Sequence, residues 1–136
     1  MHFNDFVFKG LCGQTIEIIQ THNEKLDDSL VVEVGLTGDV SGYIILVFPF
    51  IFIENIINSM MGYIPKSMSE LEMSALFETS NIICGNICTQ ISKEKDILCD
   101  IHAPHETKRP AVRPDETIAF DTGVGIFEVD IVVSYR

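Results

Sequence analysis

Residues 74–86 read SALFETSNIICGN, and this stretch determines how the rest of the chain is interpreted. At about 100° per residue, a helix through it gathers five positions into a sector of roughly 80°. Those positions are Ser74, Glu78, Asn81, Gly85 and Cys88. The opposite side is mostly apolar and consists of Leu76, Phe77, Ser80, Ile83, Cys84, Ile87 and Ile91. The stretch therefore predicts a helix with one buried side and one polar stripe.

Glu78 and Asn81 are the chemically informative residues of the stripe. They are three positions apart, and residues at that spacing are neighbours on a helix surface, so both can reach a single partner. Gly85 lies on the same stripe, although glycine inside a helix costs up to about 1 kcal/mol relative to alanine. Its place there indicates that the backbone of a partner approaches. Ser74 is a spacer or a weak contact rather than a nucleophile, because no His is near it in sequence to act as a base.

An apolar flank runs beside the stripe. Leu71, Ala75 and Ile82 lie roughly 20° to 60° from Glu78 around the helix. They form either an apolar docking rim or a surface that packs beneath a neighbouring loop, and the sequence leaves both alternatives open. Asn86, at about 80° from Glu78, lies off the stripe and is expected to meet water.

Composition restricts the classes of partner. The 136 residues fit one domain over 1–136, and 46% of them are hydrophobic, which is enough for an ordinary core. The formal net charge of -11 and the pI near 4.5 argue against nucleic acid and against an anionic membrane surface. The longest apolar run, over 43–53, contains Pro49 and is too short for a membrane helix. No signal peptide is visible, so we expect a cytoplasmic protein whose cysteines stay reduced.

Periodicity and turn residues predict the elements around the motif. In chain order they are a short helix over 4–11, strands over 15–21, 30–36 and 43–48, a helix over 50–61, the long motif helix, and strands over 97–101, 117–121 and 125–135. The motif helix begins at a capping box, either Ser69-x-x-Glu72 or the same pattern two residues earlier, and runs to about Ile91. Residues 102–115, with three prolines, are predicted as a loop. The fold class is α/β (α+β), an antiparallel or mixed sheet with two main helices on one face.

The motif lacks the parts of most hydrolases. The chain has no G-x-S-x-G elbow, no GxxxxGK[ST] phosphate loop and no H-E-x-x-H. An amide that donates and accepts hydrogen bonds can still orient a water, and a carboxylate can pair with a cation on a partner. Phosphoryl transfer depends mainly on positioning and charge neutralisation, so such a pair suffices when the partner brings its own metal and lysine. An acyl phosphate is a substrate of this kind.

The pattern Ser74-x-x-x-Glu78-x-x-Asn81 resembles the D/S-x-x-x-E-x-x-N helix of the CheC/CheX/FliY chemotaxis phosphatases. The preceding LTGDVSG at 36–42 and the helix end MMG at 60–62 also stand where that family would place them. The likeness covers roughly residues 30–136, and its single motif is most similar to CheX. CheC-like members carry two such helices. Asp5-x-x-x-Lys9-x-x-Cys12 has the spacing without the Glu and Asn, and is either a vestigial second site or chance.

The resemblance implies a partner and roles for the motif residues. The partner would be a phosphorylated CheY-type response regulator, with Glu78 pairing with its active-site lysine and Asn81 positioning the water that attacks the aspartyl phosphate. Ser74, Gly85, Leu71 and Ile82 would contact this partner. The chain itself would bind no cofactor, since the magnesium would belong to the receiver domain. The family also implies a homodimer through sheet edges.

Three other interpretations remain. Glu78 and Asn81 could form an ordinary solvated helix face. A zinc site could use Cys84, Cys88, His102 and His105, although Cys-x-x-x-Cys on a helix is a weak pattern and buried thiols are the ordinary reading. The chain could also be a non-catalytic adaptor of the same fold that binds a response regulator or a switch protein.

Overall fold

The computed structural model describes residues 17–19, 29–123 and 125–135. The helix predicted over 4–11 lies outside the described residues, as does the second motif copy at Asp5, Lys9 and Cys12. Of the strand predicted over 15–21, only 17–19 are described, and they form the strand β1 (Glu17–Ile19).

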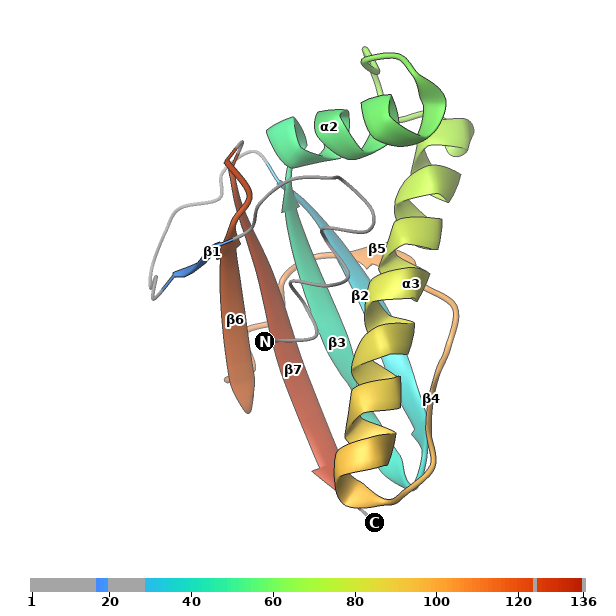
Figure 1. Cartoon of the computed structure of the whole chain (residues 1–136), viewed down its shortest axis with the longest axis vertical. Helices are drawn as coiled ribbons and strands as arrows, with labels where there is room; N and C mark the ends of the chain where they lie inside the picture. Colours follow the sequence, from blue (N-terminus) through green and yellow to red (C-terminus); the bar gives the residue numbers. More distant parts are fainter. Residues whose placement is uncertain (1–16, 20–28, 124, 136) are drawn as a thin grey trace.

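One antiparallel sheet and two helices make up the described part of the chain (Figure 1). After β1 come β2 (Ser29–Gly38), β3 (Val40–Pro49), α2 (Phe50–Met61), α3 (Glu70–Lys95), β4 (Cys99–Ile101), β5 (His105–Thr107), β6 (Glu116–Asp121) and β7 (Ile126–Tyr135). The strand order is β1-β6-β7-β3-β2-β4, with β5 also paired to β2. All pairs are antiparallel, which decides between the antiparallel and mixed alternatives. Figure 1 shows α3 running along one face of the sheet and α2 lying across the end of that face.

The β2–β3 hairpin forms the centre of the sheet, as its alternating pattern predicts. Val32, Val34 and Leu36 are buried toward the helices, whereas the residues between them are partly exposed. Gly38 ends β2 with a φ of 105°, a conformation that residues with a side chain rarely adopt. A Cβ there would lie 2.6 Å from the carbonyl oxygen of Leu98, so the turn requires glycine. Asp39 secures this contact, because its N–H donates to the Leu98 carbonyl (2.8 Å) and its carboxylate accepts from the Leu98 N–H (2.9 Å).

Both helices begin and end close to where the sequence predicts. α2 starts directly after Pro49 and ends at Gly62, which has a left-handed φ of 80°. α3 begins at the capping box Ser69-x-x-Glu72, because Glu72 accepts hydrogen bonds from the backbone N–H (3.0 Å) and the hydroxyl of Ser69. Its C-terminus was predicted too early. The helix continues to Lys95, four residues beyond Ile91, and stops at Asp96 with a left-handed φ of 53°.

Part of the sheet face opposite the helices is also covered, which the sequence did not predict. Residues 102–115 are not entirely a loop, since 105–107 form β5 on β2, and the following segment crosses behind the sheet to β6 (Figure 1). Arg109 in this segment hydrogen-bonds to Asp130 (2.9 Å) and Glu128 (3.0 Å) of β7, which are only 5% and 7% exposed. These contacts raise the pKa of the guanidinium. Arg109 therefore fastens the crossing segment to the sheet.

Candidate functional site

The structure places the predicted stripe on the outer surface of α3. Ser74, Glu78 and Asn81 are all exposed, and Gly85 is partly exposed. The prediction that Cys88 is the fifth exposed member of the stripe is wrong, because Cys88 is only 3% exposed. The reason is that β4 packs beside the C-terminal half of α3, so the helix has a narrower free face there than its periodicity indicates.

The three residues of the apolar flank do not share one environment, although the sequence predicted either an exposed docking rim or a surface packed beneath a loop. Leu71 is 58% exposed and Ile82 is 38% exposed, so neither packs beneath a loop. Ala75, in contrast, is 7% exposed and belongs to the core. Two large apolar side chains thus remain on the surface beside Glu78, one on each side of it along the helix.

The buried side of α3 holds the stripe outward. Leu76 and Ile83 lie in the core and are fully buried. Thr79 and Ser80, between Glu78 and Asn81, are also buried, and their hydroxyls donate to the carbonyls one turn earlier, those of Ala75 (3.0 Å) and Leu76 (2.9 Å). The polar run from 78 to 81 therefore splits into two inward hydroxyls that the helix satisfies and two outward side chains that are exposed to solvent.

The N-terminal end of α3 is fixed by a buried carboxylate. Glu72 accepts hydrogen bonds from Ser69 and from the hydroxyl of Tyr63, a residue of the α2–α3 connection. The hydrogen bonds from Ser69, followed by that from Tyr63, lower the pKa of Glu72. Tyr63 was not predicted from the sequence, because a contact between a connecting residue and a helix residue nine positions later has no periodic signal. The contact ties the connection to the helix that carries the stripe.

Gly85 has open space around it. Apart from its chain neighbours and the nearby backbone of its own helix, a Cβ added there would meet no atom of the described chain within 4 Å. The packing of this chain therefore does not explain why position 85 lacks a side chain in the middle of a helix.

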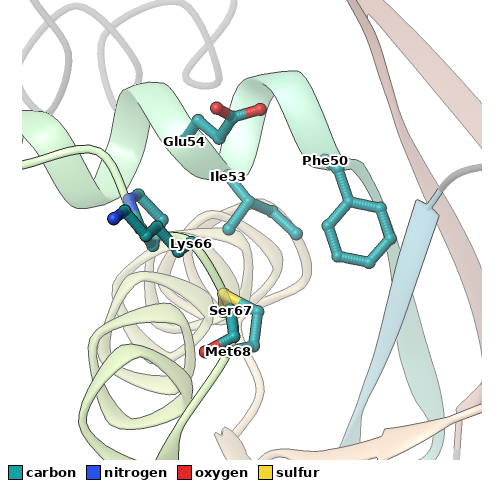
Figure 2. A pocket seen from close by; sticks show the side chains of 7 residues that line it. Phe50, Ile53, Glu54, Lys66, Ser67 and Met68 are labelled. Carbon is teal, nitrogen blue, oxygen red and sulfur yellow. The ribbon is translucent and has the colours of Figure 1, made fainter.

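A cavity of about 340 Å³ opens between α2 and the connection to α3 (Figure 2). Phe50 and Ile53 extend from α2 on the side where Ser67 and Met68 lie. The remaining lining residues are Glu54, Pro65 and Lys66. Glu78 lies about 12 Å further along α3 than its first residue, Glu70, at 1.5 Å per residue, so the cavity and the stripe are separate features.

The four residues considered for zinc do not come together. Cys84 is fully buried in the core, and His105 Nε2 lies 3.2 Å from a carboxylate oxygen of Glu33 on β2. Within the described residues, no three or more His, Cys, Asp or Glu side chains form a group that could hold a metal ion. Nor does any helix in these ranges have the length and apolar character required to cross a membrane.

These features define a class: an antiparallel α+β domain whose longest helix presents a carboxylate and an amide on an exposed face. The comparisons with known proteins identify the family. Residues 30–116, more than half of the chain, match the family described as "Chemotaxis phosphatase CheX". The chain belongs to the CheX family. No curated protein matches it.

Solved structures share the fold at low sequence identity. The chemotaxis protein CheX from Vibrio vulnificus has a TM-score of 0.76 at 16% identity, covering 96% of this chain and 93% of that one. A CheX-CheY-BeF3-Mg+2 complex from Borrelia burgdorferi matches with a TM-score of 0.72 at 19% identity, over 96% and 92%. FliY from Thermotoga maritima has a TM-score of 0.69 at 20% identity, over 95% and 82%. At these identities the likeness establishes the CheC/CheX-like fold.

Proposed function

We propose that this protein hydrolyses the aspartyl phosphate of a CheY-type response regulator. The observation that carries the proposal is that Glu78 and Asn81 are both exposed on one face of α3 in a chain of the CheX family. The similar structure from Borrelia burgdorferi is a complex of CheX with CheY, which supports a partner of the same kind here.

The two side chains have different tasks in this mechanism. The Asn81 amide accepts a hydrogen bond from a water and also donates one, which fixes the water in line with the phosphorus atom. Water attacks phosphorus, the bond to the aspartate oxygen breaks, and the products are the free carboxylate and inorganic phosphate. Magnesium, held by the receiver domain, neutralises the phosphoryl charge. Glu78 pairs with the lysine of the receiver and thereby sets the position of Asn81.

The rest of the exposed face supplies contact area. Leu71 and Ile82 provide apolar surface on either side of Glu78, and Ser74 provides a small polar contact. The absent side chain at Gly85 leaves room for the receiver backbone. These residues dock the partner without taking part in the chemistry.

The decay of a phosphorylated CheY-type receiver, measured with and without this protein, tests the proposal. We expect the protein to accelerate decay, and Asn81→Ala to reduce the acceleration by about 100-fold or more, the cost of losing a positioned hydrogen-bonding group at a reacting centre. Asn86→Ala is the matched control, because Asn86 is on the same helix but its amide donates to the Ile82 carbonyl (2.8 Å). Full activity of Asn81→Ala would refute the mechanism.

A binding measurement distinguishes the docking role of Glu78 from the catalytic role of Asn81. In a titration with a receiver carrying a phosphate mimic, Glu78→Ala is expected to weaken binding by more than about tenfold, because it leaves the lysine of the receiver without a partner. Unchanged affinity would remove the docking role. A wild-type protein that binds a receiver but does not accelerate decay would support the adaptor alternative instead.

The homodimer and the cytoplasmic location are part of the same proposal. In the described residues the sheet ends with β1 on one side and with β4 and β5, both paired to β2, on the other, and pairing of equivalent edge strands would continue it. Light scattering of the full chain tests the dimer, and a monomer at micromolar concentration would rule it out.

A further inference from the structure

Two cysteine thiols touch where α3 packs against the edge of the sheet. The Sγ atom of Cys99 in β4 lies 2.9 Å from the Sγ atom of Cys88 in α3. We propose that Cys88 and Cys99 are an oxidation site, at which a hydroperoxide converts the two thiols into an intramolecular disulfide. The inference concerns the α3–β4 contact and does not depend on the phosphatase proposal.

Regular backbone holds both sulfur atoms in place. Cys88 lies well inside α3, seven residues before its end. Cys99 pairs with Gly38 of β2, and the residue before it, Leu98, exchanges two hydrogen bonds with Asp39 in the hairpin turn. A disulfide has a sulfur–sulfur distance of about 2.05 Å, so the two atoms need to approach by only about 1 Å. The contact therefore results from two fixed elements that meet.

The two thiols differ in access, which defines the order of events. Cys99 is partly exposed, whereas Cys88 is 3% exposed, and burial together with the neighbouring Cys99 raises the pKa of the Cys88 thiol. Cys99 is therefore the thiol that a hydroperoxide reaches first. Its thiolate attacks the terminal peroxide oxygen and the O–O bond breaks, which gives a sulfenic acid and releases hydroxide from hydrogen peroxide or an alkoxide from an alkyl hydroperoxide. The Cys88 sulfur then attacks the Cys99 sulfur, and the sulfenic hydroxyl leaves with the Cys88 proton as water.

Oxidation would connect the motif helix covalently to the sheet edge. Gly85 lies one turn before Cys88 on α3, so the bond closes just beyond the C-terminal end of the exposed stripe. Reversible disulfides of reduced compartments are usually transient or redox-sensing, which agrees with the expectation that these cysteines are otherwise reduced. Cys84 lies one turn before Cys88 but is fully buried, and burial raises the pKa of its thiol, so it provides an internal control.

Peptide mapping tests the proposal on the full chain. The reduced protein is exposed to hydrogen peroxide, free thiols are blocked with N-ethylmaleimide, and trypsin is added without reductant. Cleavage after lysine separates residues 67–93, which contain Cys88, from residues 96–108, which contain Cys99. We expect the two peptides to be joined, with a mass 2 Da below their sum once any N-ethylmaleimide on Cys84 is counted. Fragment ions should place the bond at Cys88, and dithiothreitol should separate the peptides.

Variants and isotope labelling make the result specific. The joined peptide should disappear in Cys99→Ser and persist in Cys84→Ala and Cys12→Ser. A mixture of ¹⁵N-labelled and unlabelled protein should give no joined peptide of mixed label, because the bond is within one chain. Absence of the joined peptide in the wild type, a bond to Cys84 or Cys12 instead, or mixed-label products would each overturn the proposal.

Discussion

Replacing Gly85 with alanine should make the protein more stable and less able to bind its partner. Position 85 lies in the interior of a 26-residue helix, where alanine is favoured over glycine by up to about 1 kcal/mol. Apart from its chain neighbours and the nearby backbone of α3 itself, nothing in the described chain lies within 4 Å of the added Cβ, so no clash offsets that gain. For a chain of this size, about 1 kcal/mol corresponds to a rise in melting temperature of about 3–5 °C.

Binding should change in the opposite direction. If the backbone of the receiver approaches α3 at Gly85, the added methyl group prevents that approach, and the dissociation constant for a phosphate-mimic receiver should rise by about tenfold, which corresponds to about 1.4 kcal/mol. Asn86→Ala is the control, because it also improves helix propensity, by up to about 0.7 kcal/mol, but lies off the stripe. It should raise the melting temperature and leave binding unchanged.

Thermal melting by circular dichroism and titration calorimetry with the receiver, both at fixed protein concentration, give the two readouts. A lower melting temperature for Gly85→Ala would show that the space around position 85 is not open. A higher melting temperature with wild-type affinity would refute the close approach and leave Gly85 without a docking role. Only a gain in stability together with a loss of affinity agrees with the reasoning.

Three further predictions concern stability and docking. Arg109→Met should destabilise the fold by about 2 kcal/mol in urea unfolding, because two buried carboxylates lose their cation, whereas the exposed Arg113→Met should change little. Hydrogen bonds hold the pKa of Glu72 below its ordinary value of 4.5, so they stabilise the folded protein above that pH, and this stabilisation is lost as the pH falls through the folded pKa. Below pH 4.5 the wild type should therefore lose stability more steeply than Glu72→Gln. Equal slopes of stability against pH would contradict this. Leu71→Ser and Ile82→Ser should each weaken receiver binding by about fivefold to tenfold without unfolding the protein, and wild-type affinity would exclude an apolar rim.

The elements that the sequence predicts well depend on local chemistry. The β2–β3 hairpin follows from alternation over 30–36 and from the glycine and aspartate at its turn, and α2 follows from the proline before it and the glycine after it. Strand ends were less accurate, since β2 and β3 each extend a few residues beyond the predicted ranges, where pairing with a neighbouring strand continues.

Long-range contacts explain what the sequence did not predict. Arg109 is about twenty residues from the carboxylates that it binds, in a proline-rich segment with no period, so neither β5 nor the covered outer face has a local signal. The prediction that Cys88 belongs to the exposed stripe is wrong for a related reason. Helical geometry gives its direction from the axis of α3, but only the tertiary structure shows that β4 lies on that side.

The contrast between Gly38 and Gly85 shows why the site is harder to predict than the fold. Gly38 is predicted at a turn and Gly85 inside a helix, but the sequence does not show what each glycine makes room for. At Gly38 the chain itself excludes a side chain, because the Leu98 carbonyl is 2.6 Å from the position of a Cβ. At Gly85 the chain leaves the space empty. A glycine that folding requires is explained by intramolecular contacts, whereas one that costs helix stability without such a contact calls for an explanation outside the chain. The same reasoning applies to Glu78 and Asn81, which are exposed beside two hydroxyls that the helix buries and satisfies. Substitutions on this face therefore test function with little interference from folding.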